Sequence, residues 1–485
     1  MKYILSIDQS TQATKVILFD ETGKLVKRVD KAHNQIISEE GFVSHNPIEI
    51  YENTVNLVKE LLEITKIQAD NIVALGISNQ RETTVMWDKN GIPFADAVVW
   101  QCSRAKEIAE KYMSYSDRVH EITGLQLSTY FPACKMKWLI DHVQPKDEYC
   151  LGTIDSWLIY KLTKGTSFKT DATNASRTQL YDIHTGKWSE ELCKLFGIDQ
   201  KNLAEIHDCN AVFGYTDIEG ILPKEIPITA VMGDSHAALY GHGCHKDGQV
   251  KTTLGTGSSI MMNIGTKEKL STNGLSTSVA YSIDGVRTFA IEGNINYAGA
   301  VVSWLKNDLE LIEDANETQK IILDSNPSDE TVLVPAFTGL GAPYWNMHAK
   351  AMFYGMTRTT TWKELVRASV ESIAYQITDI LNAMENDTGI SIKEVKADGG
   401  PSKNQYLMQF LAECAQNTVC VSLQEELSAT GVAYMAGLTI GLYQKDNLIH
   451  QLKYDVYQNR FNRSEWQSQM NRWYEAIKLI QGKGV

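Results

Sequence analysis

The sequence lacks an excess of positive charge and has no long apolar run at its start. It contains 46 Lys and Arg residues against 59 Asp and Glu residues. The net charge of −13 gives a polyanion such as nucleic acid little reason to bind over a broad face. Asp8 interrupts the short apolar run of residues 1–12 (MKYILSIDQSTQ), which fits neither a signal peptide nor a transmembrane helix. We therefore expect a cytoplasmic protein that binds neither nucleic acid nor a membrane.

Paired cysteines and the common nucleotide-binding motifs are also missing. The eight cysteines never form a C-x-x-C pair, which in a reducing compartment predicts buried free thiols and no disulfide framework. There is no G-x-x-x-x-G-K-[ST], and neither Gly255-x-Gly257 nor Gly339-x-Gly341 completes G-x-G-x-x-G. A P-loop or a Rossmann site is therefore disfavoured, and any phosphate must be held by local turns.

The length of 485 residues is too great for one hydrophobic core, so two or three domains are expected. Apolar, β-branched segments predict strands at 3–8, 14–20, 25–29 and 72–77, with a helix that begins at about Pro47. Strands that alternate with helices favour an α/β fold. The opening strand–turn–strand pattern returns at 249–265, so we place a boundary near Gly243. The predicted domains are residues 1–243 and 244–485.

Each half offers a small polar turn between two apolar strands, Ser10-Thr-Gln12 and Gly255-Thr-Gly257. Backbone N–H groups and hydroxyls in such turns can hold phosphate, although either turn alone is more simply an ordinary hairpin. Their occurrence in two similar halves favours a shared cleft. Arg81 and Glu82 follow a buried strand, where α/β sheets bind ligands, and a donor beside an acceptor suits a small polyhydroxy ligand. A surface salt bridge is the alternative.

The segment 231–243 (VMGDSHAALYGHG) allows three kinds of chemistry. Ser235 lies in a G-x-S-x-G nucleophile elbow of a hydrolase, but Ala237 replaces the second glycine. Asp234 lies between an apolar strand (228–232) and a small-residue helix, where an aspartate acts as a general base or simply caps the helix. A zinc site would use residues whose spacing fits no standard pattern: His236, His242, Cys244 and His245. The pattern modestly favours Asp234 as a base.

Several stretches resemble the FGGY family of carbohydrate kinases. They are NQRETTVMW (79–87), VVWQC (98–102), YFPACKMKWLIDH (130–142), DATNASRT (171–178), FTGLGAPYW (337–345) and AMFYGMTRTTTWKELVRASVE (351–371). The resemblance runs from about residue 4 to about residue 445. It implies a two-domain, actin-like ATPase fold with a ribonuclease H-like core in each half, and a cleft that closes over ATP and a polyol.

The resemblance further implies ATP-dependent phosphorylation of a small polyol, with glycerol, converted to glycerol 3-phosphate, as the leading substrate. Asp234 would be the general base, and Asp8 and Asp234 would lie at Mg²⁺. The residues implied to bind the substrate are Arg81, Glu82, Trp100, Tyr130, Asp234 and Ser235. The residues implied to line the nucleotide are Thr11, Gln12, Lys15, Thr256, Gly299, Ser303, Gly400 and Asn404. Subunits in this family often pair, so a homodimer is compatible with the sequence.

Several positions depart from the pattern of the glycerol-phosphorylating members. Lys15 stands where an arginine is usual, which keeps the charge but loses the planar fork. Ser235 replaces a glutamine and Ser259 replaces an aromatic residue, and in those members the replaced residues contact the substrate that accepts the phosphoryl group (the acceptor). Ser303 replaces a glutamine on the nucleotide side. Because the first two serines remove bulk, the alternative substrate is a longer polyol or a ketose of the erythritol, xylulose or ribulose type. A non-catalytic homologue that binds nucleotide or sugar is a further alternative.

Overall fold

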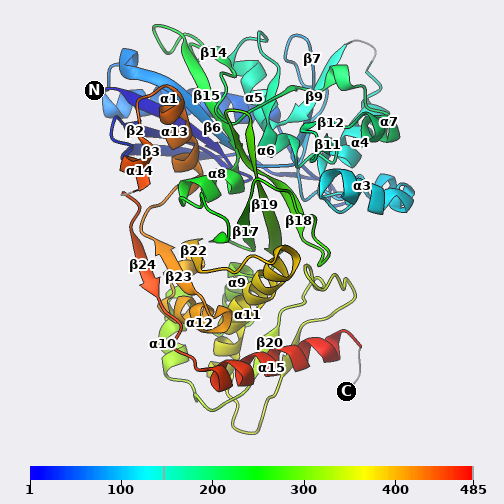
Figure 1. Cartoon of the computed structure of the whole chain (residues 1–485), viewed down its shortest axis with the longest axis vertical. Helices are drawn as coiled ribbons and strands as arrows, with labels where there is room; N and C mark the ends of the chain where they lie inside the picture. The colour runs from blue at the N-terminus through cyan, green and yellow to red at the C-terminus, as the bar shows by residue number, and fades with distance from the viewer. Residues whose placement is uncertain (146–147, 450, 483–485) are drawn as a thin grey trace.

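The computed structural model describes residues 1–145, 148–449 and 451–482. Two α/β halves follow one another along the longest axis of the molecule; the first sheet lies in the upper part of Figure 1, and the second sheet lies below it, across the middle of the view. The predicted two-domain α/β fold is therefore confirmed, while the boundary near Gly243 stays a prediction. Within the described residues, no helix combines the length and the apolar character that crossing a bilayer requires.

The first sheet has six strands in the order β14-β15-β6-β1-β2-β3. Their bounds are β1 (Tyr3–Gln9), β2 (Ala13–Asp20), β3 (Leu25–Ala32), β6 (Ile72–Asn79), β14 (Gly214–Thr216) and β15 (Ile226–Gly233). β2 is antiparallel to β1 and β3, whereas β6 is parallel to both β1 and β15. The opening strands predicted from the sequence are confirmed. The parallel register aligns Gln9, Asn79 and Gly233, so the carboxyl ends of three strands meet at one edge.

The second sheet repeats this arrangement. Its order is β18-β19-β17-β16-β22-β23-β24. Its strands are β16 (Gln249–Leu254), β17 (Ser258–Gly265), β18 (Ser276–Ile283), β19 (Val286–Ile295), β22 (Glu394–Gly399), β23 (Thr418–Ser422) and β24 (Tyr454–Tyr457). Antiparallel β19, β17 and β16 are followed by parallel β22 and β23, as β3, β2 and β1 are followed by β6 and β15. The repeat predicted at 249–265 is thus a second copy of the opening hairpin.

A third sheet, in the order β4-β5-β8-β7-β9, lies in the first half of the chain. Its strands are β4 (Ile36–Ile37), β5 (Val43–His45), β7 (Thr84–Asp88), β8 (Ala97–Val98) and β9 (Tyr149–Thr153). The remaining short strands are β10 (Lys169–Asp171), β11 (Tyr181–Asp182), β12 (Lys187–Trp188), β13 (Glu205–His207), β20 (Val332–Val334) and β21 (Met352–Tyr354). Residues that are predicted to bind the substrate lie in the segment between β6 and β7 and in the segment that follows β8.

The two longest helices, α1 and α11, begin where the sequence signals predict. Asn46 accepts hydrogen bonds from the first turn of α1, and Thr361 and Glu364 form a capping box at the start of α11. The helices of the first half are α1 (Pro47–Thr65), α2 (Lys106–Lys111), α3 (Ser116–Thr123), α4 (Pro132–Val143), α5 (Ile154–Leu162), α6 (Ala172–Ala175), α7 (Glu190–Phe196) and α8 (Asp234–Gly241). Those of the second half are α9 (Gly299–Asn307), α10 (Thr318–Leu323), α11 (Trp362–Thr388), α12 (Gln405–Ala415), α13 (Leu427–Thr439), α14 (Lys445–Ile449) and α15 (Arg463–Ile480).

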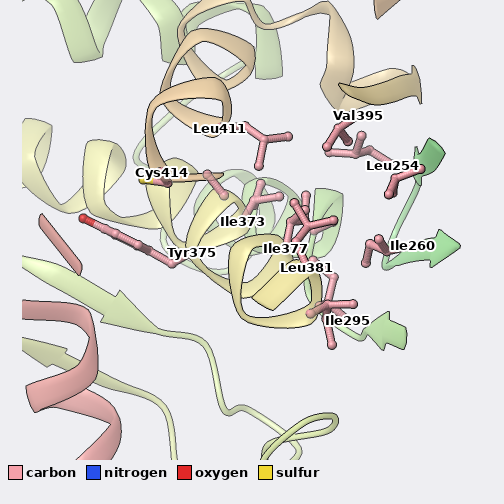
Figure 2. Close-up of a cluster of buried hydrophobic side chains, with 14 of the residues drawn as sticks. Leu254, Ile260, Ile295, Ile373, Tyr375, Ile377, Leu381, Val395, Leu411 and Cys414 are labelled. Atoms are coloured by element: carbon pink, nitrogen blue, oxygen red, sulfur yellow. The ribbon is translucent and has the colours of Figure 1, made fainter. Parts of the chain in front are cut away.

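Helix α11 forms the centre of the second core. Its apolar residues recur at helical spacing, as the sequence predicts, and Ile373 and Ile377 are fully buried. Figure 2 shows these side chains beside Leu254 and Ile260 of the second sheet and Leu411 of α12. This packing holds the β16–β17 turn and the start of α12 in fixed positions on either side of a cavity described below.

Helix α13 packs against α8 and also contacts β1, β6 and β15 of the first sheet. The two helices approach so closely that a Cβ atom at Gly431 would lie 1.9 Å from the carbonyl oxygen of Ala237. At Gly241 an added Cβ would lie 2.3 Å from the carbonyl oxygen of Leu427. Only glycine permits such backbone contact. A helix from late in the chain therefore fixes α8, whose first residue is Asp234.

Candidate active site

Two adjoining cavities contain many of the residues predicted to bind the nucleotide. The first, of about 480 Å³, is lined by five of these predicted residues: Thr256, Gly299, Ser303, Gly400 and Asn404. The second, of about 640 Å³, is lined by Asp8 and Lys15 from the first sheet and by Asp398 and Gly399 at the end of β22. Gly400 and Lys403 line both cavities, so the two adjoin at the start of the segment that leads into α12.

The backbone around the first cavity is suited to negative charge. A Cβ atom at Gly299 would lie 2.7 Å from the carbonyl oxygen of Gly255, so the start of α9 packs directly on the β16–β17 turn. Asn404 caps α12 by accepting a hydrogen bond from the N–H of Leu407. The N-termini of α9 and α12 both line this cavity, and the positive ends of their dipoles favour phosphate binding there.

Asp8 and Lys15 form a charged pair across the first hairpin. Lys15 Nζ lies 3.3 Å from Asp8 Oδ2 and 2.7 Å from Glu426 Oε2, while the Ser78 hydroxyl donates to Asp8 Oδ1 at 2.9 Å. Burial disfavours the ammonium, but the two carboxylates outweigh burial and raise the pKa of Lys15 above its usual value. Lys15 therefore carries a fixed positive charge beside Asp8 in the second cavity.

Thr11 and Gln12 are placed differently. Neither lines the two cavities, and the Thr11 hydroxyl accepts a hydrogen bond of 2.9 Å from the indole N–H of Trp100. The Thr11 carbonyl lies 2.8 Å from His33 Nε2. The Thr11 hydroxyl thus connects the first hairpin to Trp100, which is predicted to bind the substrate. The side chain of Gln12 is exposed to solvent.

Asp234 and Arg81 lie together at the carboxyl edge of the first sheet. Arg81 Nε lies 3.2 Å from Asp234 Oδ1, and the two terminal nitrogens of Arg81 each donate to Glu292 of β19 at 2.9 Å. Asp234 remains about one-third exposed, whereas Glu292 is fully buried. Burial raises the pKa of Asp234 above its usual value, and Arg81 opposes this effect. A carboxylate with raised basicity therefore faces solvent from a fixed position.

Glu82 and Tyr130 lie beside this pair. Arg177 Nε lies 2.6 Å from Glu82 Oε1, and its Nη1 lies 2.8 Å from Glu292 Oε2, so Arg177 joins Glu82 to the same buried network. Burial favours the protonated form of Glu292, but the guanidinium groups of Arg177 and Arg81 outweigh it and hold the pKa well below its usual range. The ring of Tyr130 lies 5.3 Å from that of Trp100, which forms an aromatic wall.

The structure does not support the zinc interpretation of the 231–243 segment. The imidazole of His236 is fully buried and lies 3.1 Å from the Ser278 hydroxyl, and burial lowers its pKa well below the usual value. Among the described residues there is no group of three or more His, Cys, Asp or Glu side chains arranged to hold a metal. Ser235 donates its backbone N–H to Asp234 at 2.6 Å, which fixes the carboxylate.

The sequence alone did not identify Glu292, Arg177, Lys135 and Lys251 as parts of the site. Lys251 is fully buried, and its Nζ lies 3.2 Å from the Ser259 hydroxyl, which in turn donates to Glu292 Oε1 at 2.9 Å. A lone glutamate in the apolar run TFAIEG was the available signal for Glu292, since an isolated carboxylate in a buried strand needs a partner. For Lys251 the sequence offers no comparable signal, because the strand QVKTTL mixes polar and apolar residues.

The doubled sheet order and the charged cavity between the halves define a two-domain α/β protein with a similar core in each half. The N-terminal domain of the "FGGY family of carbohydrate kinases" matches residues 3–241, and the C-terminal domain of that family matches residues 250–440. The chain belongs to the FGGY family of carbohydrate kinases.

Relatives with known names cover nearly the whole chain. The glycerol kinase of Alkaliphilus oremlandii is 43% identical over 457 residues, which are 92% of this chain and 91% of that protein. Glycerol kinase 1 of Thermotoga maritima is 43% identical over 489 residues, 99% of each chain. The crystal structure of Plasmodium falciparum glycerol kinase with ADP superimposes with a TM-score of 0.94 at 35% identity and covers 99% of this chain and 98% of that chain. A gluconate kinase from Lactobacillus acidophilus, at 21% identity and a TM-score of 0.89, shows the fold alone.

Proposed function

We propose that this carbohydrate kinase transfers the terminal phosphoryl group of ATP to glycerol, which gives glycerol 3-phosphate and ADP. The observation that carries the proposal is the pair of Asp234 and Arg81, with a partly exposed carboxylate held at the carboxyl edge of the first sheet. The relatives named glycerol kinase support the choice of acceptor, because they match at about 40% identity over nearly their full length. The adjoining cavities at Thr256, Gly400 and Asp8 supply space for a nucleotide and its phosphates.

The residues of the site can bring the acceptor hydroxyl in line with the phosphate. Arg81 and the second carboxylate oxygen of Glu82 would bind the hydroxyls of glycerol, and the rings of Trp100 and Tyr130 would cover its carbon chain. The attacking hydroxyl would give its proton to a carboxylate oxygen of Asp234 as its oxygen bonds to phosphorus and the bond from phosphorus to ADP breaks. Phosphoryl transfer depends mainly on positioning, so fixed groups suffice for catalysis.

The carboxylates of Asp8 and Asp234 are suited to Mg²⁺. Magnesium is commonly held by one or two protein carboxylates together with phosphate oxygens and water, and Asp8 presents its carboxylate at the edge of the cavity that adjoins the predicted nucleotide site. When bound, the ion would neutralise the phosphate charge during transfer. In this proposal Lys15, held by Asp8 and Glu426, supplies further positive charge. A cytoplasmic location and a homodimer stay predictions.

One observation keeps a longer acceptor as a second candidate. Ser259 presents a hydroxyl between Lys251 and Glu292, and Ser235 is partly exposed beside Asp234. These small polar side chains leave room and hydrogen-bonding groups where bulkier residues would close the pocket. A four- or five-carbon polyol or ketose would use them for hydroxyls beyond the third carbon.

A panel of acceptors decides between these substrates. The purified chain is incubated with Mg-ATP and, in separate reactions, with glycerol, dihydroxyacetone, erythritol, xylulose, ribulose or gluconate, and the release of ADP is measured. We expect the highest kcat/KM with glycerol. A higher value with erythritol or a pentulose would replace glycerol as the acceptor but keep the kinase, whereas no ADP above background with any acceptor would contradict the proposed function.

A further inference from the structure

Lys135 of α4 is a fully buried lysine that the proposed reaction does not use. Its Nζ donates hydrogen bonds to two backbone carbonyl oxygens, those of Tyr130 and, at 3.4 Å, Glu82. These carbonyls belong to two separate segments, the turn after β6 and the turn before α4. Burying an ammonium is costly unless it makes compensating bonds, so the position of this group is unlike that of an ordinary surface lysine.

The turn that carries Glu82 needs external support. Glu82 has a φ of 62°, a left-handed backbone conformation that non-glycine residues rarely adopt. The turn is tight, since the N–H of Thr83 donates to the carbonyl of Arg81 at 2.7 Å. Strain of this kind persists only where surrounding contacts enforce it, and the ammonium of Lys135 is one such contact.

We infer that Lys135 is a positioning residue of the acceptor pocket, because its ammonium fixes the Glu82 turn relative to Tyr130 so that both can bind the acceptor. The inference rests on the proposed function, since it assigns Glu82 and Tyr130 to acceptor binding. Lys135 itself acts through these two residues and has no direct part in phosphoryl transfer. Replacement of Lys135 should therefore weaken binding of the acceptor. Binding of the nucleotide should change little, because the nucleotide cavity at Thr256 and Asn404 lies in the other half of the molecule.

The test compares Lys135→Met, which removes the ammonium and keeps much of the volume, with Lys135→Arg, which keeps a positive donor. Lys137→Met is the matched control, because Lys137 lies on the same helix, pairs with Asp141 and is partly exposed. We expect Lys135→Met to raise KM for glycerol by about tenfold or more, with KM for ATP within about twofold of wild type. Lys135→Arg should recover most of the lost affinity, and Lys137→Met should behave as wild type.

Calorimetric titration of each variant with glycerol measures acceptor binding without turnover. If Lys135→Met does not fold, Lys135→Gln is measured instead, and its KM values and glycerol affinity are judged by the same criteria. Glutamine keeps a hydrogen-bond donor but carries no charge. Equal increases in KM for glycerol and ATP, or an unchanged glycerol affinity in a folded variant, would overturn the inference. The wild-type reactions separate the two proposals: a wild-type chain that releases no ADP with any acceptor contradicts the proposed function, whereas an active wild type with a normal Lys135→Met contradicts only the role of Lys135.

Discussion

Arg81 holds Asp234 through its Nε, which lies 3.2 Å from Asp234 Oδ1. The other side of the same guanidinium binds Glu292, so Asp234, the proposed general base in the first half, is connected to a strand of the second half through one side chain. Both Arg81 and Glu292 are buried. The position of Asp234 therefore depends on how the two halves of the chain meet.

Replacement of Glu292 should destabilise the fold as well as the site. Glu292→Gln leaves the buried guanidiniums of Arg81 and Arg177 without their shared carboxylate, and breaking a buried ion pair typically costs about 3–5 kcal/mol. We expect the free energy of unfolding in urea to fall by an amount of this order. Glu268→Gln is the control, since Glu268 pairs with His184 at the surface and should change it by no more than about 0.5 kcal/mol. Equal stabilities of the two variants would contradict the role of the network.

The pH dependence of activity should report the raised pKa of Asp234. Burial favours the protonated form, which cannot accept the proton of the acceptor, so activity is lost as the pH falls through this raised pKa. We expect the acid limb of a profile of kcat/KM for glycerol to lie above 3.8, the usual value for an aspartate. An acid limb at or below that value would show that Asp234 is not the group whose ionisation limits the reaction.

Lys135 should give a second pH effect, in the opposite direction. Burial lowers the pKa of Lys135 to about 7, although the carboxylate of Glu82 opposes this shift. The thiols of Cys102 and Cys134 also lie nearby, and burial raises the pKa of Cys134 to about 12, so this thiol stays neutral. Because the ammonium is lost as the pH rises through about 7, KM for glycerol should increase above that pH in wild type. Lys135→Arg stays charged and should show a flat profile, and a parallel rise in both proteins would contradict the assignment.

The contact between α8 and α13 should be sensitive to a single methyl group. Gly431→Ala places a Cβ 1.9 Å from the Ala237 carbonyl oxygen, so the helices must separate. Overpacking of this kind costs about 1–3 kcal/mol, and the shift of α8 should also lower kcat by displacing Asp234. Thermal unfolding and initial rates measure the two effects. Thr439→Ala, at the partly exposed end of α13, is the control and should change neither.

Local sequence signals predicted the parts of the fold and site that depend on neighbouring residues. The two hairpins, the caps at Asn46 and Thr361, and the placement of Asp234 between a strand and a helix all follow from patterns a few residues long. The packing of α13 on the first sheet could not be predicted in this way, because it joins segments far apart in the chain.

The buried charges show why the rest of the site was missed. Lys135 lies in a helical pattern in which a lysine is normally solvated, and only the packed structure shows that its Nζ meets the carbonyls of Glu82 and Tyr130. Arg177 and Glu292 likewise become partners only when the two halves meet. The place of Thr11 at the nucleotide stays a prediction, and the hydrogen bond that its hydroxyl accepts from Trp100 is a contact that no local pattern indicates.

The most direct test of the proposed reaction compares wild type with Asp234→Asn in a single assay of glycerol-dependent ADP release from Mg-ATP. The amide keeps the size of the side chain but cannot accept the proton, and loss of a general base typically lowers the rate by about 10²–10⁴-fold. We predict a fall in kcat of this order, with ADP binding to the variant unchanged in a calorimetric titration. If Asp234→Asn, in a preparation free of native enzyme, released ADP at the rate of wild type, the result would contradict the assignment of Asp234 as the base.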